Sequence, residues 1–249
     1  MSQRVNIFET CLNGALYPRT TQASREILVR LGYDVRLPKA QVCCGQMHFN
    51  SGYPDEIDAM LRSFYRNNLD ADYVIFPSAS CAAMVRENYP ELAQRWLSGG
   101  NRRRLGELIS RSFELVEFLH AFHGDVGTSA WFPHRATLHP TCHSLRSLRL
   151  GSATREILSQ VEDIELIENP TQNTCCGFGG TFSIKNEATS AAMLADKVTS
   201  IRATGAAYVI ALDNSCLMHI SGGMDRARLA IRPIHIAEVL ASTRSMQFC

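Results

Sequence analysis

The sequence has neither an excess of charge of one sign nor a long hydrophobic run. Its 249 residues include 25 Lys and Arg against 24 Asp and Glu, so the formal net charge is +1. General binding of polyanions requires a strongly basic surface, and a bilayer-spanning helix requires roughly 18–20 apolar residues in succession. The first residues, MSQRVNIFETC, also contain no signal-peptide core. We therefore expect no nucleic-acid partner, no membrane span and a cytoplasmic location.

Short motifs for zinc and nucleotides are missing as well. The sequence contains no C-x2–4-C knuckle, the usual source of zinc ligands, and no P-loop. The glycines at 177, 179 and 180 do not have the G-x-G-x-x-G spacing of a dinucleotide-binding turn. These absences leave the cysteines as the main chemical signal.

Cysteine accounts for nine of the residues, a density well below that of a disulfide scaffold. A reducing compartment disfavours stable disulfides, so clustered cysteines there favour metal binding or redox chemistry. Eight of them form a repeat with offsets of 131, 132, 132 and 135 residues, in which Cys11, Cys43, Cys44 and Cys81 correspond to Cys142, Cys175, Cys176 and Cys216. Cys249 lies outside the repeat, and we assign it no role. The repeat predicts two homologous halves, 1–125 and 126–249, joined within the Gly- and Pro-containing segment 121–135.

Hydrophobic periodicity predicts alternating strands and helices in both halves. We expect strands at 5–8, 33–37, 73–76, 136–139, 164–167 and 208–212, and helices at 21–31, 54–69 and 187–204. Asn186 is expected to cap the last of these helices and Gly205 to end it. The pattern predicts an α/β protein with two Rossmann-like halves and mainly parallel strands, three in each half.

Each repeated cysteine follows an expected strand. Ligands of open α/β sheets bind beyond the carboxyl ends of the strands, so three loops in each half can bring thiols together there. Cys81 and Cys216 also lie at expected helix starts, where the helix dipole favours a thiolate. The glycines Gly45, Gly177, Gly179 and Gly180 are expected to let the backbone approach a bound cofactor closely.

Four thiolates in one place repel one another, so such a site requires cations. Thiolate-rich sites select zinc or iron–sulfur clusters, and ligands drawn from three distant loops favour a centre with several iron atoms. A dithiol that exchanges disulfides without metal, a structural zinc scaffold and simple burial of small side chains are the alternatives. His139 and His143 flank Cys142, and either a ligand or proton-relay role or loop hydrogen bonding fits them.

Four segments resemble a known family: CCGQ at 43–46, HPTC at 139–142, TCCGFGGTFS at 174–183 and HIAEVL at 235–240. They are similar to the lactate utilisation protein A family and, more widely, to the duplicated cysteine-rich CCG domain found in heterodisulfide reductases. The resemblance implies an electron-transfer subunit of a three-protein bacterial system that oxidises L-lactate to pyruvate. It also implies one or two iron–sulfur clusters of the 4Fe-4S type, with the eight repeated cysteines as metal ligands.

The chain departs from the wider family at two points. Heterodisulfide reductase repeats end in C-x-x-C, whereas here Met84 and His219 occupy the last position. Four cysteines per half still suffice for an ordinary cluster; His219 could add an imidazole, and Met84 is expected to pack. No ferredoxin-type cysteine run is present, so one of two expected partner subunits would carry those clusters. We find no catalytic residues for lactate, which leaves a redox subunit as the main hypothesis and a heterodisulfide reductase-type subunit as the alternative.

Overall fold

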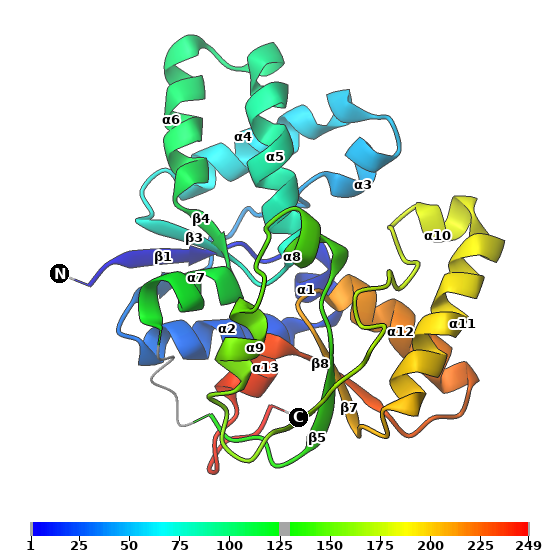
Figure 1. The fold of residues 1–249 in the computed structure, drawn as a ribbon. Coiled ribbons are helices and arrows are strands. Elements are labelled where there is room, and N and C mark those ends of the chain that lie inside the picture. Colours follow the sequence, from blue (N-terminus) through cyan, green and yellow to red (C-terminus); the bar gives the residue numbers. More distant parts are fainter. Residues whose placement is uncertain (1, 125–129, 249) are drawn as a thin grey trace.

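Two parallel sheets with the same strand order form the framework of the protein (Figure 1). The computed structural model describes residues 2–124 and 130–248. The first sheet has the order β2-β1-β3-β4 and the second the order β6-β5-β7-β8. The strands are β1 (Arg4–Ile7), β2 (Asp34–Arg36), β3 (Tyr73–Phe76), β4 (Ser112–Glu114), β5 (Arg135–His139), β6 (Glu165–Ile167), β7 (Tyr208–Ala211) and β8 (Arg232–His235). The predicted α/β class with two Rossmann-like halves is therefore confirmed.

The central strands are apolar because helices cover both faces of each sheet, as parallel sheets require. Ile7 lies opposite Ile75 in the first sheet and Leu138 opposite Ile210 in the second. On the outer face of the first sheet lie η1 (Pro54–Ile57), α4 (Asp58–Asn68), α5 (Ala79–Trp96) and α6 (Gly99–Ser110). On the outer face of the second lie α11 (Glu187–Ala203) and α12 (Asn214–Arg226).

The two halves share a core between their inner faces. It contains α2 (Pro18–Arg30) and α7 (Leu115–His123) from the first half and α9 (Ala153–Leu158) and α13 (Ile236–Ala241) from the second. Helix α2 packs against α13, and α7 packs against α9. Fully buried Ile27 and Leu240 belong to this core, and burying one such side chain contributes about 1.5–3 kcal/mol. The shared core fixes the two sheets relative to each other.

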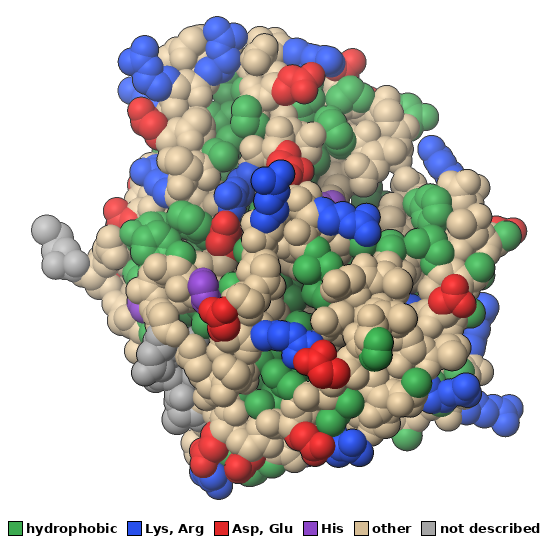
Figure 2. Space-filling model, viewed as in Figure 1, with side chains coloured by type: hydrophobic (Ala, Val, Ile, Leu, Met, Phe, Trp, Pro, Cys, Tyr) green, Lys and Arg blue, Asp and Glu red, His purple; other side chains and the backbone are tan. Residues whose placement is uncertain are grey.

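Four short helices lie near the carboxyl ends of the strands. They are α1 (Cys11–Leu16), α3 (Gln46–Asn50), α8 (Cys142–Arg146) and α10 (Phe182–Lys185). Helix α1 contacts α12, and α8 contacts α5, so each half places a short helix against the other half. On the face drawn in Figure 2, basic and acidic side chains are interspersed, with basic ones over the start of α6.

Three expectations from the sequence need correction. Each sheet has a fourth strand: β4 is only three residues long, and β8 contains Pro233, which an edge strand tolerates. Cys11 and Cys142 begin short helices instead of lying in loops. Asn186 occupies the N-cap of α11, but its side chain makes no capping hydrogen bond to the described residues.

The expected helix end at Gly205 is confirmed, and two other assignments concern residues that the structure does not describe. Gly205 follows the end of α11 with φ of +64°, as expected of a glycine that ends a helix. The boundary between residues 125 and 126 falls within 125–129, and Cys249 is the last residue; both lie outside the described residues. The boundary and the absence of a role for Cys249 therefore stay predictions. Among the described residues, none of the helices has the length and apolar character needed to cross a membrane.

Candidate metal centre

The first half brings its four cysteine sulfurs together from three segments. Cys11 begins α1, where the preceding Thr10 accepts a hydrogen bond from the Asn13 amide at 3.3 Å. The Sγ atoms of Cys11 and Cys43 are 3.7 Å apart, and those of Cys44 and Cys81 are 3.1 Å apart. Cys81 lies in the first turn of α5. The local sequence thus uses two helix starts and one loop to gather a sulfur quartet, defined as Cys11, Cys43, Cys44 and Cys81.

The second half repeats this construction. Cys142 begins α8 after the capping residue Thr141, and Cys216 lies in the first turn of α12. Cys175 raises the pKa of the Cys142 thiol and Cys142 lowers the pKa of Cys175, so these two interact, and the sulfurs of Cys176 and Cys216 lie within 4.8 Å of each other. The second sulfur quartet therefore consists of Cys142, Cys175, Cys176 and Cys216.

Gly45 and Gly177 fix the backbone after each adjacent pair. Their φ angles are +83° and +88°, and their amides donate to the sulfurs of Cys43 and Cys175 at 3.4 and 3.3 Å. A Cβ at Gly45 would approach Ile57 to 2.9 Å, and one at Gly177 would approach the Ser190 carbonyl oxygen to 2.7 Å. The glycines are thus required by the turn and by the packing behind it. Their direct contact with a cofactor stays a prediction.

Electrostatics make one thiolate favourable in each quartet. Hydrogen bonds from neighbouring thiols, Cys11 first, hold the pKa of Cys43 far below its ordinary value, and those from Cys142 and Cys176 do the same for the pKa of Cys175. The same hydrogen bonds, with burial, raise the pKa of Cys44 and Cys176. Further deprotonation is costly because the negative charges would lie side by side away from water. A bound cation removes that cost, and the sulfur donors fit a soft metal or an iron–sulfur cluster.

Both quartets face one cavity between the halves. The cavity has a volume of about 420 Å³, and all eight repeated cysteines line it, together with Gly179 and Gly180. Gln46 and His143 join the halves beside it through a 3.0 Å hydrogen bond. The arrangement agrees with the general rule that ligands of such sheets bind beyond the carboxyl ends of the strands.

A largely buried polar network, whose members line the cavity, links the two halves. One carboxylate oxygen of Asp213 accepts hydrogen bonds from the hydroxyls of Ser78 and Ser80 at 2.5 and 2.8 Å and from the Ser80 amide at 3.2 Å. The side chain of Asn214 donates to Asn13 at 2.9 Å. Sequence patterns gave no sign of this network, because its members become neighbours only when the halves pack.

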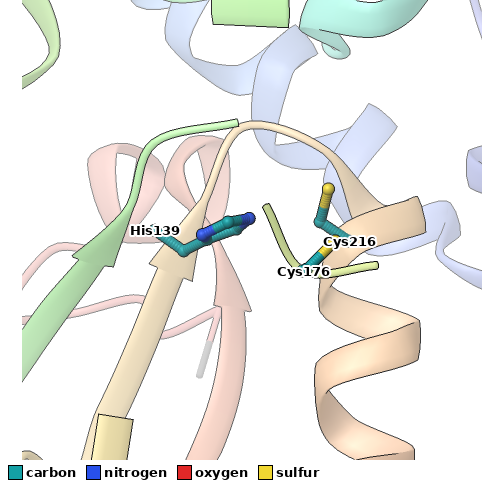
Figure 3. Close-up of side chains that lie close together, drawn as sticks. All are labelled: His139, Cys176 and Cys216. Carbon is teal, nitrogen blue, oxygen red and sulfur yellow. The ribbon is translucent and has the colours of Figure 1, made fainter. Parts of the chain in front are cut away.

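The second quartet has two polar neighbours. His139 is buried at the end of β5, and its ring points toward Cys176 and Cys216 (Figure 3). A ring nitrogen and the two sulfurs lie within 4.8 Å of one another. Buried Lys197 donates to the carbonyls of Thr171 and Gln172, both at 3.1 Å. Burial, followed by the charge of Lys197, lowers the pKa of His139 to about 3, so the ring is neutral.

The place of Lys197 beside the second quartet was not predicted from the sequence, although its position on an apolar helix face was a signal. It lies one turn before Ile201 on α11 and next to Val198, so a charged residue stands on an apolar helix face. Such residues are almost never fully buried unless paired. Here the sulfurs of the second quartet supply negative charge that favours the ammonium form, while burial lowers the pKa of Lys197.

The other residues singled out in the sequence have structural partners. Met84 is buried in the apolar cluster of the first half, as expected. His219 lies 3.3 Å from the Ser190 hydroxyl and against the Phe178 ring. The structure thus brings His139, and not His219, close to two cysteines.

Comparison with known proteins agrees with the repeat. Residues 5–86 and 136–221 both match the family described as "Cysteine-rich domain" (CCG). The chain is 41% identical over 246 residues to "Lactate utilization protein A" of Bacillus pumilus (strain SAFR-032), covering 96% of this chain and 99% of that protein. The protein of the same name from Bacillus subtilis (strain 168) is 36% identical, with coverage of 96% and 99%. The chain belongs to the lactate utilization protein A family.

These two members of the family match over nearly their whole length, so the duplicated cysteine-rich domain makes up most of the shared chain. Among solved structures, glutamate racemase isoform RacE1 from Bacillus anthracis covers 96% of this chain and 79% of its own. Its sequence identity is 12% and its TM-score 0.37, a likeness too weak to support any conclusion.

Proposed function

We propose that the protein is an iron–sulfur electron-transfer subunit of a multi-subunit system that oxidises L-lactate to pyruvate. The observation that carries the proposal is the gathering of all eight repeated cysteines, in two quartets, around one cavity. The name of the relatives supports the link to lactate. In this proposal each half, 1–125 or 126–249, holds one cluster through its own quartet.

The residues around each quartet fit a cluster of this kind. When bound, a cluster accepts and releases one electron at a time, whereas oxidation of lactate to pyruvate releases two electrons and two protons. The amides of Gly45 and Gly177 donate to sulfur, and such hydrogen bonds tune reduction potentials. Buried Cys44 and Cys176 keep water from one side of each quartet. Two sites on one chain would relay the electrons singly between partner subunits.

The partners follow from what the chain does not supply. We propose that two further subunits complete the system, one of them carrying ferredoxin-type clusters, and that the complex works in the cytoplasm. Lactate binding and removal of its hydrogen would take place on a partner, so the isolated chain is expected to be inactive on lactate.

A heterodisulfide reductase-type role is the second candidate, since a cavity bounded by both quartets could admit a small disulfide. Anaerobic reconstitution with iron and sulfide distinguishes the possibilities. About four iron and four sulfide per cluster, with a visible chromophore that dithionite bleaches, is the expected result. Disulfide cleavage by the reduced protein would favour the reductase, and stoichiometric zinc without colour would favour a structural scaffold.

A further inference from the structure

The two quartets differ at one position next to the sulfurs. His139 precedes Cys142 by three residues, and Phe8 precedes Cys11 by three residues, so the two are counterparts in the repeat. Phe8 is buried and stacks on Phe76, with ring centroids 4.8 Å apart. The first half therefore has an apolar ring where the second has an imidazole.

His139 is a buried polar side chain without a polar partner among the described residues. Neither ring nitrogen forms a hydrogen bond within the part of the chain that the structure describes. The Gln172 backbone carbonyl lies near the ring, yet it does not reach hydrogen-bond geometry with either nitrogen. Buried polar atoms are nearly always paired, so two orphaned nitrogens in one buried ring call for an explanation.

The position of the neighbouring sulfurs explains the unpaired nitrogens. A nitrogen of His139 and the sulfurs of Cys176 and Cys216 already lie within 4.8 Å of one another, before any metal draws them together. The ring therefore lies where a nitrogen can bind iron beside these two sulfurs.

We propose that His139 is a nitrogen ligand of the second metal centre, on the side of Cys176 and Cys216. The first centre has sulfur ligands alone, and the second has sulfur and nitrogen ligands. This inference rests on the proposed function, because it takes the second quartet to hold iron. Both centres keep four thiolates, and the second has a neutral nitrogen ligand in addition, so the two centres differ in ligand set and in reduction potential.

The test uses the full chain with Cys44→Ser, which leaves only the second centre intact, grown with 15N-labelled histidine and reconstituted anaerobically. After reduction, pulsed EPR should show a 15N coupling of the size found for nitrogen bonded directly to iron. His139→Phe, which copies Phe8 of the first half, should lose this coupling and change the reduction potential of the second centre. His143→Phe and His219→Phe are the matched controls and should keep it.

The possible results separate this inference from the proposed function. A cluster that assembles without such a coupling, or with only the weak coupling of an N–H···S hydrogen bond, overturns the ligand role and leaves the electron-transfer role standing. A coupling that survives His139→Phe does the same. Failure of the unsubstituted protein to take up iron overturns both. If His139→Phe does not fold, His139→Ala should regain the coupling when 15N-imidazole is added.

Discussion

The first half surrounds its quartet with aromatic side chains, whereas the second half surrounds its quartet with a histidine and a lysine. Phe8 and Tyr89 belong to the same apolar cluster as Cys44 and Cys81, and the Tyr89 hydroxyl donates to the Cys44 carbonyl at 3.1 Å. Near the second quartet lie His139, the counterpart of Phe8, and Lys197. The sulfurs are placed by backbone features that both halves keep, namely strand ends, helix caps and a glycine turn. Side chains around them can therefore diverge without moving the ligands.

The same contrast recurs at two helix caps. Ser78 caps its own helix by accepting a hydrogen bond from the Cys81 amide, and it also donates to Asp213 of the other half. Its counterpart Asp213 makes no capping hydrogen bond to the described residues. The last residue of the fourth strand in each half caps the helix that follows: Glu114 caps α7 and His235 caps α13. Corresponding positions in the two halves thus carry side chains that differ in their ionisable groups.

The largest expected effect is the loss of one centre at a time. Cys44→Ser and Cys176→Ser should each lower iron and sulfide by about half, because each quartet has its own four ligands. Metal analysis and visible absorbance after anaerobic reconstitution measure this. Cys249→Ser, outside the repeat, should retain all of the iron. Loss of all iron from either single variant would show that the quartets share one centre.

The two glycine turns should differ in how well they tolerate a side chain. Gly45→Ala and Gly177→Ala both force a residue with Cβ into positive φ, which costs about 1–3 kcal/mol. Gly177→Ala should cost more, because its Cβ meets the fixed Ser190 carbonyl, whereas Ile57 beside Gly45 can shift its side chain. Urea unfolding of the metal-free protein measures both losses.

A glycine in a helix supplies the control for this pair. Gly222→Ala in α12 should raise the free energy of unfolding by about 0.5–1 kcal/mol, since its Cβ would meet no described atom within 4 Å. Equal losses at 45 and 177 would mean that the backbone of α11 yields as readily as a side chain.

Removing the charge of Asp213 should weaken the hydrogen bonds that link the two halves. Asp213→Asn should lower the free energy of unfolding by about 1–3 kcal/mol, because hydrogen bonds to charged groups are stronger than those to neutral ones. Urea unfolding measures the loss. Asp225→Asn, exposed on the same helix, should change the stability by less than about 0.5 kcal/mol. An unaffected Asp213→Asn protein would show that apolar packing alone joins the halves.

The caps Glu114 and His235 should give opposite pH dependences. Burial lowers the pKa of His235 from 6.5 to about 4, so its contribution to stability is complete above pH 6.5 and is lost as the pH falls toward 4. Burial raises the pKa of Glu114 above 4.5, so its contribution is complete below pH 4.5 and is lost as the pH rises. Each slope is at most about 1.4 kcal/mol per pH unit.

Unfolding free energies of the metal-free protein at pH 4.5 to 8 test this contrast. His235→Asn, which keeps a capping side chain, should remove the decline on the acid side. Glu114→Gln should remove the decline on the alkaline side. Parallel pH profiles for the wild type and both variants would show that neither cap titrates in this range.

Much of the framework could be predicted because it repeats along the chain. The near-constant cysteine offsets predicted the two halves, and apolar runs located β1, β3, β5 and β7. The strands β4 and β8 were not predicted. β4 has only three residues and β8 contains a proline, so neither shows a clear periodicity. The identity of the sulfur residues followed from the sequence, but the partners of His139, Lys197 and Asp213 did not. Those partners lie far away along the chain, so no local pattern can predict them.

The alternation of strands and helices apart from β4 and β8, the duplication and the choice of sulfur donors were determined by the sequence alone, because each depends on local periodicity or on matched spacing. Tertiary packing decided that the two quartets face one cavity and that an imidazole, a lysine and an aspartate lie where they do. The physical reason is that the shared core of α2, α7, α9 and α13 sets the angle between the sheets, and only that angle brings the strand ends of both halves together.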